Sequence, residues 1–167
     1  MTRSPWIRAA LVAVGVVVLD QLAKHAVRAS IVEGEEHGVL PGVALVNTRN
    51  RGVAFGFLPG DPVAVTVVIA LALLALLVYF ALHSTRPLIW LPTGMLLGGA
   101  LGNVIDRLRA GYVTDFVKLP LGWPPFNLAD VSITLGVLIL LLVIERPREG
   151  RASEADPPVG GPRGAGT

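Results

Sequence analysis

The segment that most restricts the fold of this chain is VAVTVVIALALLALLVYFAL, residues 63–82, which contains no charged side chain. A helix of about 20 consecutive apolar residues matches the thickness of the hydrocarbon core of a lipid bilayer. In a helix, the segment also satisfies its own backbone hydrogen bonds, as crossing that core requires. The chain is therefore predicted to be an integral membrane protein.

The composition of the whole chain agrees with this prediction. Of the 167 residues, 53% are hydrophobic and only 16% are charged. Three further stretches reach spanning length. The four predicted transmembrane helices are residues 6–27, 62–82, 88–105 and 126–144.

The first stretch could instead be a cleaved secretory signal, because Arg3 and Arg8 precede an apolar run from Ala9 to Leu19. Three more apolar stretches follow it, and these favour a retained helix. Residues 1–146 are thus expected to form one membrane domain. Residues 147–167 are rich in Pro, Gly and charge and are expected to form a disordered tail.

Two classes of function are excluded by simple counts. The formal net charge is only +2 and the basic residues are scattered, which argues against nucleic acid as a partner. The chain has no cysteine, which rules out disulfide bonds and thiolate catalysis.

The unusual polar residues gather on one side of the predicted bundle. With four spans, the C-terminal ends of the first and third helices share a side with the N-terminal ends of the second and fourth. Charged groups at membrane depth cost several kcal/mol unless paired or hydrated, and they are usually functional. The residues on this side are Asp20, Gln21, Lys24, Asn50, Gly52, Asn103, Asp106, Arg107, Asn127 and Asp130.

Helical spacing predicts how some of these residues meet. Asp20 and Lys24 are four residues apart and are expected to form an ion pair. Arg107 follows Asp106 directly and is its expected counter-charge. The glycines of GMLLGGALG, residues 94–102, recur every fourth position and are assigned to close helix packing.

A small β-sheet is expected on the same side. GYVTDFVKL, residues 111–119, alternates with the period of a strand, and VLPGVALVNT, residues 39–48, is a candidate for a second short strand. The alternation places Asp115 on a face with aliphatic residues, where its pKa should be raised.

Carboxylate chemistry fits these residues better than its rivals. A serine–lysine site is disfavoured because Ser132 points away from the stripe of Asn127 and Asp130. A histidine metal site is disfavoured because no HExxH spacing occurs. Asp115 and Asp130 lack a neighbouring cation in the sequence and could share one proton as an aspartic dyad. A cation-translocating pair or a purely structural pair remains open.

Five blocks resemble the lipoprotein signal peptidases, also called signal peptidase II. They are DQLAK (20–24), NRGVAF (50–55), GGALGNVIDR (98–107), VTDF (113–116) and FNLAD (126–130), and they occur in the family's order. The resemblance covers roughly residues 6–144. It implies an all-α membrane protein with four transmembrane helices. It also implies a small extracytoplasmic β-sheet and a nearby mobile segment over the substrate, which together would correspond to residues 30–60 and 109–120.

The resemblance also implies an activity and a site. The protein would be an aspartic endopeptidase that removes the signal peptide from diacylglyceryl-modified prolipoproteins by cleaving before the lipidated cysteine. It would use no cofactor or metal and would act as a monomer among membrane lipids. Asp115 and Asp130 would be catalytic; the residues that bind substrate or brace the site would be Asp20, Lys24, Asn50, Gly52, Asn103, Asp106, Arg107, Asn127 and Ala129.

The orientation follows from the resemblance and not from charge counting. The Lys and Arg residues divide evenly between the two predicted sides, so the positive-inside rule does not decide. The family implies the bacterial cytoplasmic membrane, cytoplasmic termini and an active site toward the extracytoplasmic face. The alternative from a different class is a small carboxylate-lined membrane transporter or channel component.

Overall fold

A computed structural model describes residues 4–52 and 62–145 of the chain. The described residues form four helices: α1 (Pro5–Ser30), α2 (Pro62–His83), α3 (Trp90–Ala110) and α4 (Leu128–Glu145). They also form three strands: β1 (Glu36–Leu40), β2 (Val43–Asn50) and β3 (Val113–Lys118). The C-terminal tail and the end of the NRGVAF block lie outside the described residues.

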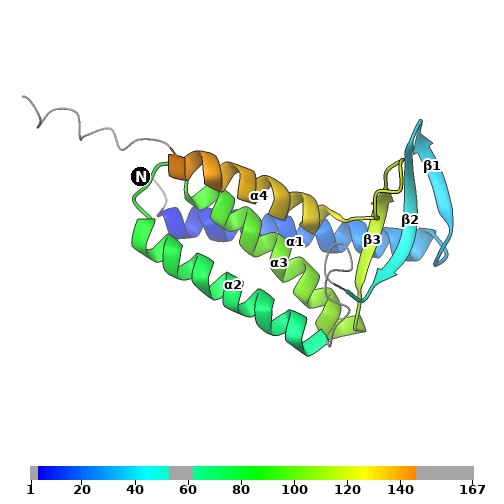
Figure 1. Ribbon diagram of the computed structural model, residues 1–167, viewed down its shortest axis with the longest axis horizontal. Helices are drawn as coiled ribbons and strands as arrows, with labels where there is room; N and C mark the ends of the chain where they lie inside the picture. Colours follow the sequence, from blue (N-terminus) through cyan, green and yellow to red (C-terminus); the bar gives the residue numbers. More distant parts are fainter. Residues whose placement is uncertain (1–3, 53–61, 146–167) are drawn as a thin grey trace, which may run out of the picture.

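The helices lie side by side, and the sheet covers one end of the bundle (Figure 1). The first turn of α1 and the last turn of α4 lie at the opposite end (Figure 1). This arrangement places the C-terminal ends of α1 and α3 beside the N-terminal end of α4, as the sequence predicts for the polar residues.

The sheet is antiparallel, with the strand order β1–β2–β3. The expected single strand over residues 39–48 is wrong, because this segment contains the end of β1, a turn, and most of β2. Gly42 occupies this turn with a φ of +79°, a conformation that glycine adopts without steric cost. Thr48 on β2 lies opposite Asp115 on β3, so the sheet delivers Asp115 to the end of the bundle.

Helix α3 lies at the centre of the bundle because its glycines admit two neighbours. A Cβ atom at Gly98 would lie 2.7 Å from the carbonyl oxygen of Ala13 on α1. A Cβ atom at Gly99 would lie 2.6 Å from the carbonyl oxygen of Ala129 on α4. The predicted role of the glycines in close packing is confirmed at Gly98, whose neighbour Gly99 does the same for α4.

Large apolar side chains remain exposed along the outside of the bundle. Leu71 on α2 is 60% exposed, Leu22 on α1 is 61% exposed and Leu142 on α4 is 61% exposed. Among the described residues, α1 and α4 are long and apolar enough to cross a membrane, whereas the described apolar part of α2 is the shorter Val67–His83. These residues support a membrane protein, and the number of spans stays a prediction.

We expect Gly98→Ala to weaken the contact between α1 and α3. The added methyl group meets backbone of α1, so the helices must separate, at a cost of about 1–3 kcal/mol. The thermal unfolding midpoint of the detergent-purified protein measures this loss. Gly15→Ala is the matched control, since a Cβ atom at Gly15 has no atom within 4 Å, and its midpoint should not fall. Equal midpoints for the two variants would contradict the packing argument.

Candidate active site

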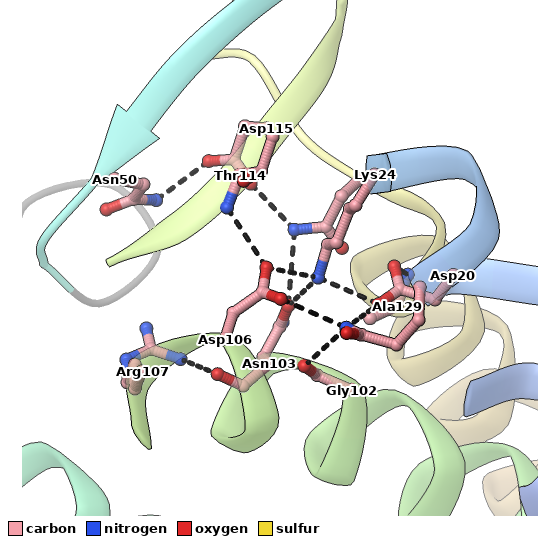
Figure 2. A network of polar contacts seen from close by, with 12 residues as sticks. Asp20, Lys24, Asn50, Gly102, Asn103, Asp106, Arg107, Thr114, Asp115 and Ala129 are labelled. Carbon is pink, nitrogen blue, oxygen red and sulfur yellow. Dashed lines mark hydrogen bonds and ion pairs between the residues drawn. The ribbon is translucent and has the colours of Figure 1, made fainter. Parts of the chain in front are cut away.

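The predicted site residues meet where α1, α3 and α4 reach the sheet. Asp20 and Lys24 come from α1, Asn103 and Asp106 from α3, and Asp115 from β3. Figure 2 shows these side chains pointing toward one another in a continuous polar network. The other members reached by this network are Asn50, Gly52, Arg107, Asn127, Ala129 and Asp130.

Lys24 lies at the centre of the network and is fully buried. Its Nζ lies 2.8 Å from Oδ2 of Asp20, 3.1 Å from Oδ2 of Asp106 and 2.9 Å from Oδ1 of Asn103. An ammonium group has three N–H donors, and each of them therefore has an acceptor. The ion pair predicted between Asp20 and Lys24 is confirmed, and Lys24 also links α1 to α3.

The two carboxylates around Lys24 also accept backbone hydrogen bonds. Oδ1 of Asp20 accepts the N–H of Ala129, at 2.9 Å, at the start of α4. Oδ2 of Asp106 accepts the N–H of Thr114, at 3.2 Å, on β3. Each carboxylate therefore ties a different element to the buried lysine.

The expected pairing of Arg107 with Asp106 is wrong. Consecutive helical residues project about 100° apart, so neighbours in sequence do not face each other. Lys24 neutralises Asp106 instead, while the guanidinium of Arg107 donates to the carbonyl oxygens of Gly52, at 2.9 Å, and Asn103, at 3.2 Å. Arg107 thus fixes the chain just after β2, where Gly52 also donates its N–H to Oδ1 of Asn50.

Asp130 is held in the first turn of α4 by a reciprocal pair of hydrogen bonds with Asn127. Oδ1 of Asn127 accepts the N–H of Asp130 at 3.0 Å, and Oδ2 of Asp130 accepts the N–H of Asn127 at 3.1 Å. This is the geometry of a capping box, which satisfies backbone donors at the start of a helix. Oδ1 of Asp130 also accepts the side-chain amide of Asn103 at 2.9 Å.

Asp115 is 3% exposed and is held by two side-chain amides. Its Oδ2 accepts Nδ2 of Asn50 at 2.9 Å (Figure 2), and its Oδ1 accepts Nδ2 of Asn127 at 2.6 Å. The same Nδ2 of Asn127 also reaches Oδ1 of Asn103 at 3.2 Å. Asn103 and Asn127 therefore connect the carboxylates of Asp115 and Asp130.

Burial is the main cause of an altered acidity at Asp115. Loss of solvation, reinforced by the negative charge of Asp130, raises the pKa of Asp115 from 3.8 to about 6. The hydrogen bonds from Asn50 and Asn127 and the charge of Lys24 oppose this rise in the pKa. The direction predicted from the strand pattern is confirmed.

Both aspartates face one pocket, which has a volume of about 520 Å³. Its polar lining includes Asn50, Asn103 and Arg107, and most of its remaining wall is apolar. The apolar lining comes from α2, α3, β3, α4 and the segment between β3 and α4: Ile69, Ala100, Val113, Leu119, Trp123, Pro124, Pro125, Phe126, Val131, Ile133 and Leu135. The pocket can therefore hold a largely apolar ligand against two carboxyl groups.

The network contains residues that are not among the predicted catalytic, binding or bracing residues. Nε2 of Gln21 donates to Oδ1 of Asp106 at 3.0 Å, and Oγ1 of Thr48 donates to the carbonyl oxygen of Asp115 at 3.0 Å. NH1 of Arg28 donates to Oγ1 of Thr114 at 2.9 Å. Arg28 was recognisable by spacing, because positions 20, 24 and 28 continue one face of α1.

Comparison with protein families gives a match over most of the chain. Residues 12–145 match the family described as signal peptidase (SPase) II. A lipoprotein signal peptidase of Moorella thermoacetica is 43% identical over 147 residues, which cover 84% of this chain and 96% of the relative. A lipoprotein signal peptidase of Syntrophomonas wolfei is 40% identical over 139 residues, covering 81% of this chain and 93% of the relative.

Solved structures give the same result for the fold. A bacterial membrane enzyme solved at 2.3 Å resolution superimposes with a TM-score of 0.74 at 32% identity, covering 81% of this chain and 86% of the other. A second such enzyme, solved at 1.9 Å resolution, gives a TM-score of 0.73 at 32% identity and covers 83% of this chain and 92% of the other. The described fold is therefore that of a bacterial membrane enzyme.

We expect Lys24→Met to destabilise the protein by about 3–5 kcal/mol, because Asp20 and Asp106 would remain buried without their shared cation. The thermal unfolding midpoint in detergent reports the loss. Lys118→Met is the matched control, since Lys118 pairs with Glu36 on the exposed surface and should contribute only about 0–1 kcal/mol. A Lys24→Met midpoint as high as that of the control would contradict the central role of Lys24.

The raised pKa of Asp115 predicts how stability depends on pH. Between pH 3.8 and about 6, the folded state keeps a proton that the unfolded state has lost, so this group favours folding at low pH and the advantage disappears as pH rises through about 6. Asp115→Asn removes this dependence. The difference in unfolding midpoint, variant minus wild type, should grow from pH 4 to pH 7 by the equivalent of about 1–3 kcal/mol. A difference that does not change with pH would contradict the shift.

Proposed function

The chain belongs to the signal peptidase II family, whose relatives establish that it removes signal peptides from prolipoproteins, and we propose that it does so as an aspartic endopeptidase. Asp115 and Asp130 would be the catalytic pair. The observation that carries this proposal is that Asn103 and Asn127 connect two carboxylates that face one pocket. The relatives reported above give the transporter alternative no support.

The substrate would be a prolipoprotein that already carries a diacylglyceryl group, cleaved before the lipidated cysteine. Such a substrate combines two apolar acyl chains with a polar peptide that must meet water. The pocket offers both surfaces, since Ile133 and Leu135 of α4 line it together with Asp130. Acyl chains would lie against the apolar wall while the scissile peptide bond lies between the carboxyl groups.

The two aspartates would divide the chemistry according to their surroundings. Asp115 has the raised pKa, so it would hold the shared proton and donate it to the oxygen of the scissile carbonyl group. Asp130 would take a proton from water as the water oxygen attacks the carbonyl carbon. When the tetrahedral intermediate collapses, the C–N bond breaks, the proton on Asp130 passes to the departing amine, and Asp115 takes back a proton from one hydroxyl group of the intermediate as the new carbonyl group forms.

The residues around the pair would hold this geometry. Asn50 and Asn127 donate to separate oxygens of Asp115, so its carboxyl group is fixed in its plane. Arg107 lines the pocket and donates a hydrogen bond to the carbonyl oxygen of Gly52. We infer that Arg107 and Gly52 orient the substrate backbone, whereas Asp20, Lys24, Asp106 and Ala129 brace the helices beneath.

The protein is a membrane-embedded bacterial enzyme, and we propose a four-span arrangement in the cytoplasmic membrane. Both termini would be cytoplasmic, and the sheet and the active site would lie on the extracytoplasmic side. Helix α4 has 18 residues and a length of about 27 Å, close to the thickness of the hydrocarbon core. Asp130, in its first turn, would then lie at the boundary between lipid and water. The enzyme would act as a monomer.

A cleavage assay tests the proposed catalytic pair. Purified protein in detergent or lipid is given a diacylglyceryl-modified prolipoprotein in the presence of a chelator, and the size shift of the product is followed on a gel. Asp115→Asn and Asp130→Asn should each lower the cleavage rate by at least about 10³-fold, because neither variant can carry out both proton transfers. Wild type should cleave with the chelator present.

Glu35→Gln is the matched control for this assay. It makes the same carboxylate-to-amide change at an exposed side chain on the sheet end of the molecule, where it should leave cleavage unchanged. Unfolding midpoints of all variants show whether a loss reflects folding. Substantial cleavage by either folded aspartate variant would refute the catalytic pair, and a requirement for a metal ion would refute the metal-independent mechanism.

A further inference from the structure

Arg28 lies on the same face of α1 as Asp20 and Lys24, one turn closer to the sheet. Its NH1 donates to Oγ1 of Thr114 at 2.9 Å and lies 3.9 Å from Oδ1 of Asp106. Thr114 is fully buried and immediately precedes Asp115 on β3. Arg28 therefore contacts the strand that carries one aspartate of the pair.

Charge balance gives Arg28 a second role in this position. The buried cluster contains two carboxylates, Asp20 and Asp106, but only one ammonium group, that of Lys24. Arg28 is the further cation in contact with Asp106 among the described residues. With Arg28, the formal charges of these four residues sum to zero.

Thr114 is thereby held at two atoms by two different elements. Its N–H donates to Oδ2 of Asp106 on α3, at 3.2 Å, and its hydroxyl oxygen accepts the hydrogen bond from Arg28 on α1. Two contacts on neighbouring atoms fix both the position of β3 and its rotation about its own axis. The rotation of a strand decides which way the next side chain points, and here that side chain is Asp115.

We propose that Arg28 and Thr114 act together as positioning residues that aim Asp115 at Asn127 and Asp130. The inference rests on the proposed catalytic role of Asp115. Among the residues that the structure describes, neither Arg28 nor Thr114 lines the pocket. Loss of their contact should therefore reduce turnover without weakening substrate binding.

The test is a double-mutant cycle on cleavage of a diacylglyceryl-modified prolipoprotein, with kcat and KM measured well below each variant's unfolding midpoint. Arg28→Met should lower kcat about ten-fold and leave KM unchanged, because small misplacements of a catalytic group cost rate. Thr114→Val, which keeps the shape but removes the acceptor, should lower kcat in the same way. The double variant should be no slower than Arg28→Met, because the two residues act through one contact.

Two further variants separate positioning from general stability. Arg28→Lys keeps the charge and should recover most of the lost kcat. Arg49→Met is the matched control: Arg49 lies opposite Thr114 in the ladder, yet its guanidinium pairs with Glu33 and stacks on Tyr112. Its kcat should equal that of wild type.

These measurements test the positioning role of Arg28 and Thr114 separately from the proposed catalytic pair. Independent, multiplicative losses in the double variant, a change confined to KM, or equal losses in Arg28→Met and Arg49→Met would each overturn the proposal. If Arg28→Met does not fold, an unchanged kcat in Thr114→Val overturns it equally. Cleavage by folded Asp115→Asn would instead refute the proposed catalytic pair, whatever the Arg28 variants do.

Discussion

The ammonium group of Lys24 is the contact on which the rest of the site depends. A charged group without solvent is tolerated only when its hydrogen bonds are satisfied, and Lys24 achieves this through Asp20, Asp106 and Asn103. Those partners lie on α1 and α3, so satisfying one ion fixes two helices against each other. Asp20 then reaches the first turn of α4 and Asp106 reaches β3, which extends the same constraint to the elements that carry Asp130 and Asp115.

Amide side chains stand between this ion cluster and the two aspartates facing the pocket. The oxygen of the Asn103 side chain accepts a hydrogen bond from Lys24, and its nitrogen donates one to Asp130. Asn103 therefore links Asp130 to the ion cluster through a neutral amide and not through the ammonium group itself. Asn127 similarly meets Asp115 with a neutral donor. Burial raises the pKa of Asp115; its neutral amide partners oppose this rise without reversing it, whereas a directly bound lysine would favour the charged carboxylate more strongly. The arrangement thus separates the cation that stabilises the fold from Asp115, the carboxyl group that we propose holds the shared proton.

Much of this organisation could be predicted from the sequence, because the periodicities of helices and strands are local properties of the chain. Helical spacing predicted the pair of Asp20 and Lys24, and the order of the apolar segments predicted that the polar residues lie at one end of the bundle. The partner of Asp106 could not be found in this way, since adjacency to Arg107 suggested a pair, whereas the true partner comes from another helix. The hairpin through residues 39–48 was missed because the segment was read as one short strand, although Pro41 and Gly42 form a turn between β1 and β2. Arg28 had the right spacing, but only the position of β3 reveals what it contacts.

Helices in lipid gain little from hydrophobic association, since the acyl chains around them are as apolar as their own side chains. Close packing and interhelical hydrogen bonds must hold them together, and both occur at the same place in this protein. A Cβ atom at Gly102 would lie 2.7 Å from Oδ2 of Asp20, so this glycine leaves room for a carboxylate as well as for a helix. The polar network therefore joins the bundle and supports the site. We expect Lys24, at its centre, to be required for the fold, whereas Asp115 and Asp130, the proposed catalytic pair, lie where the network meets the pocket.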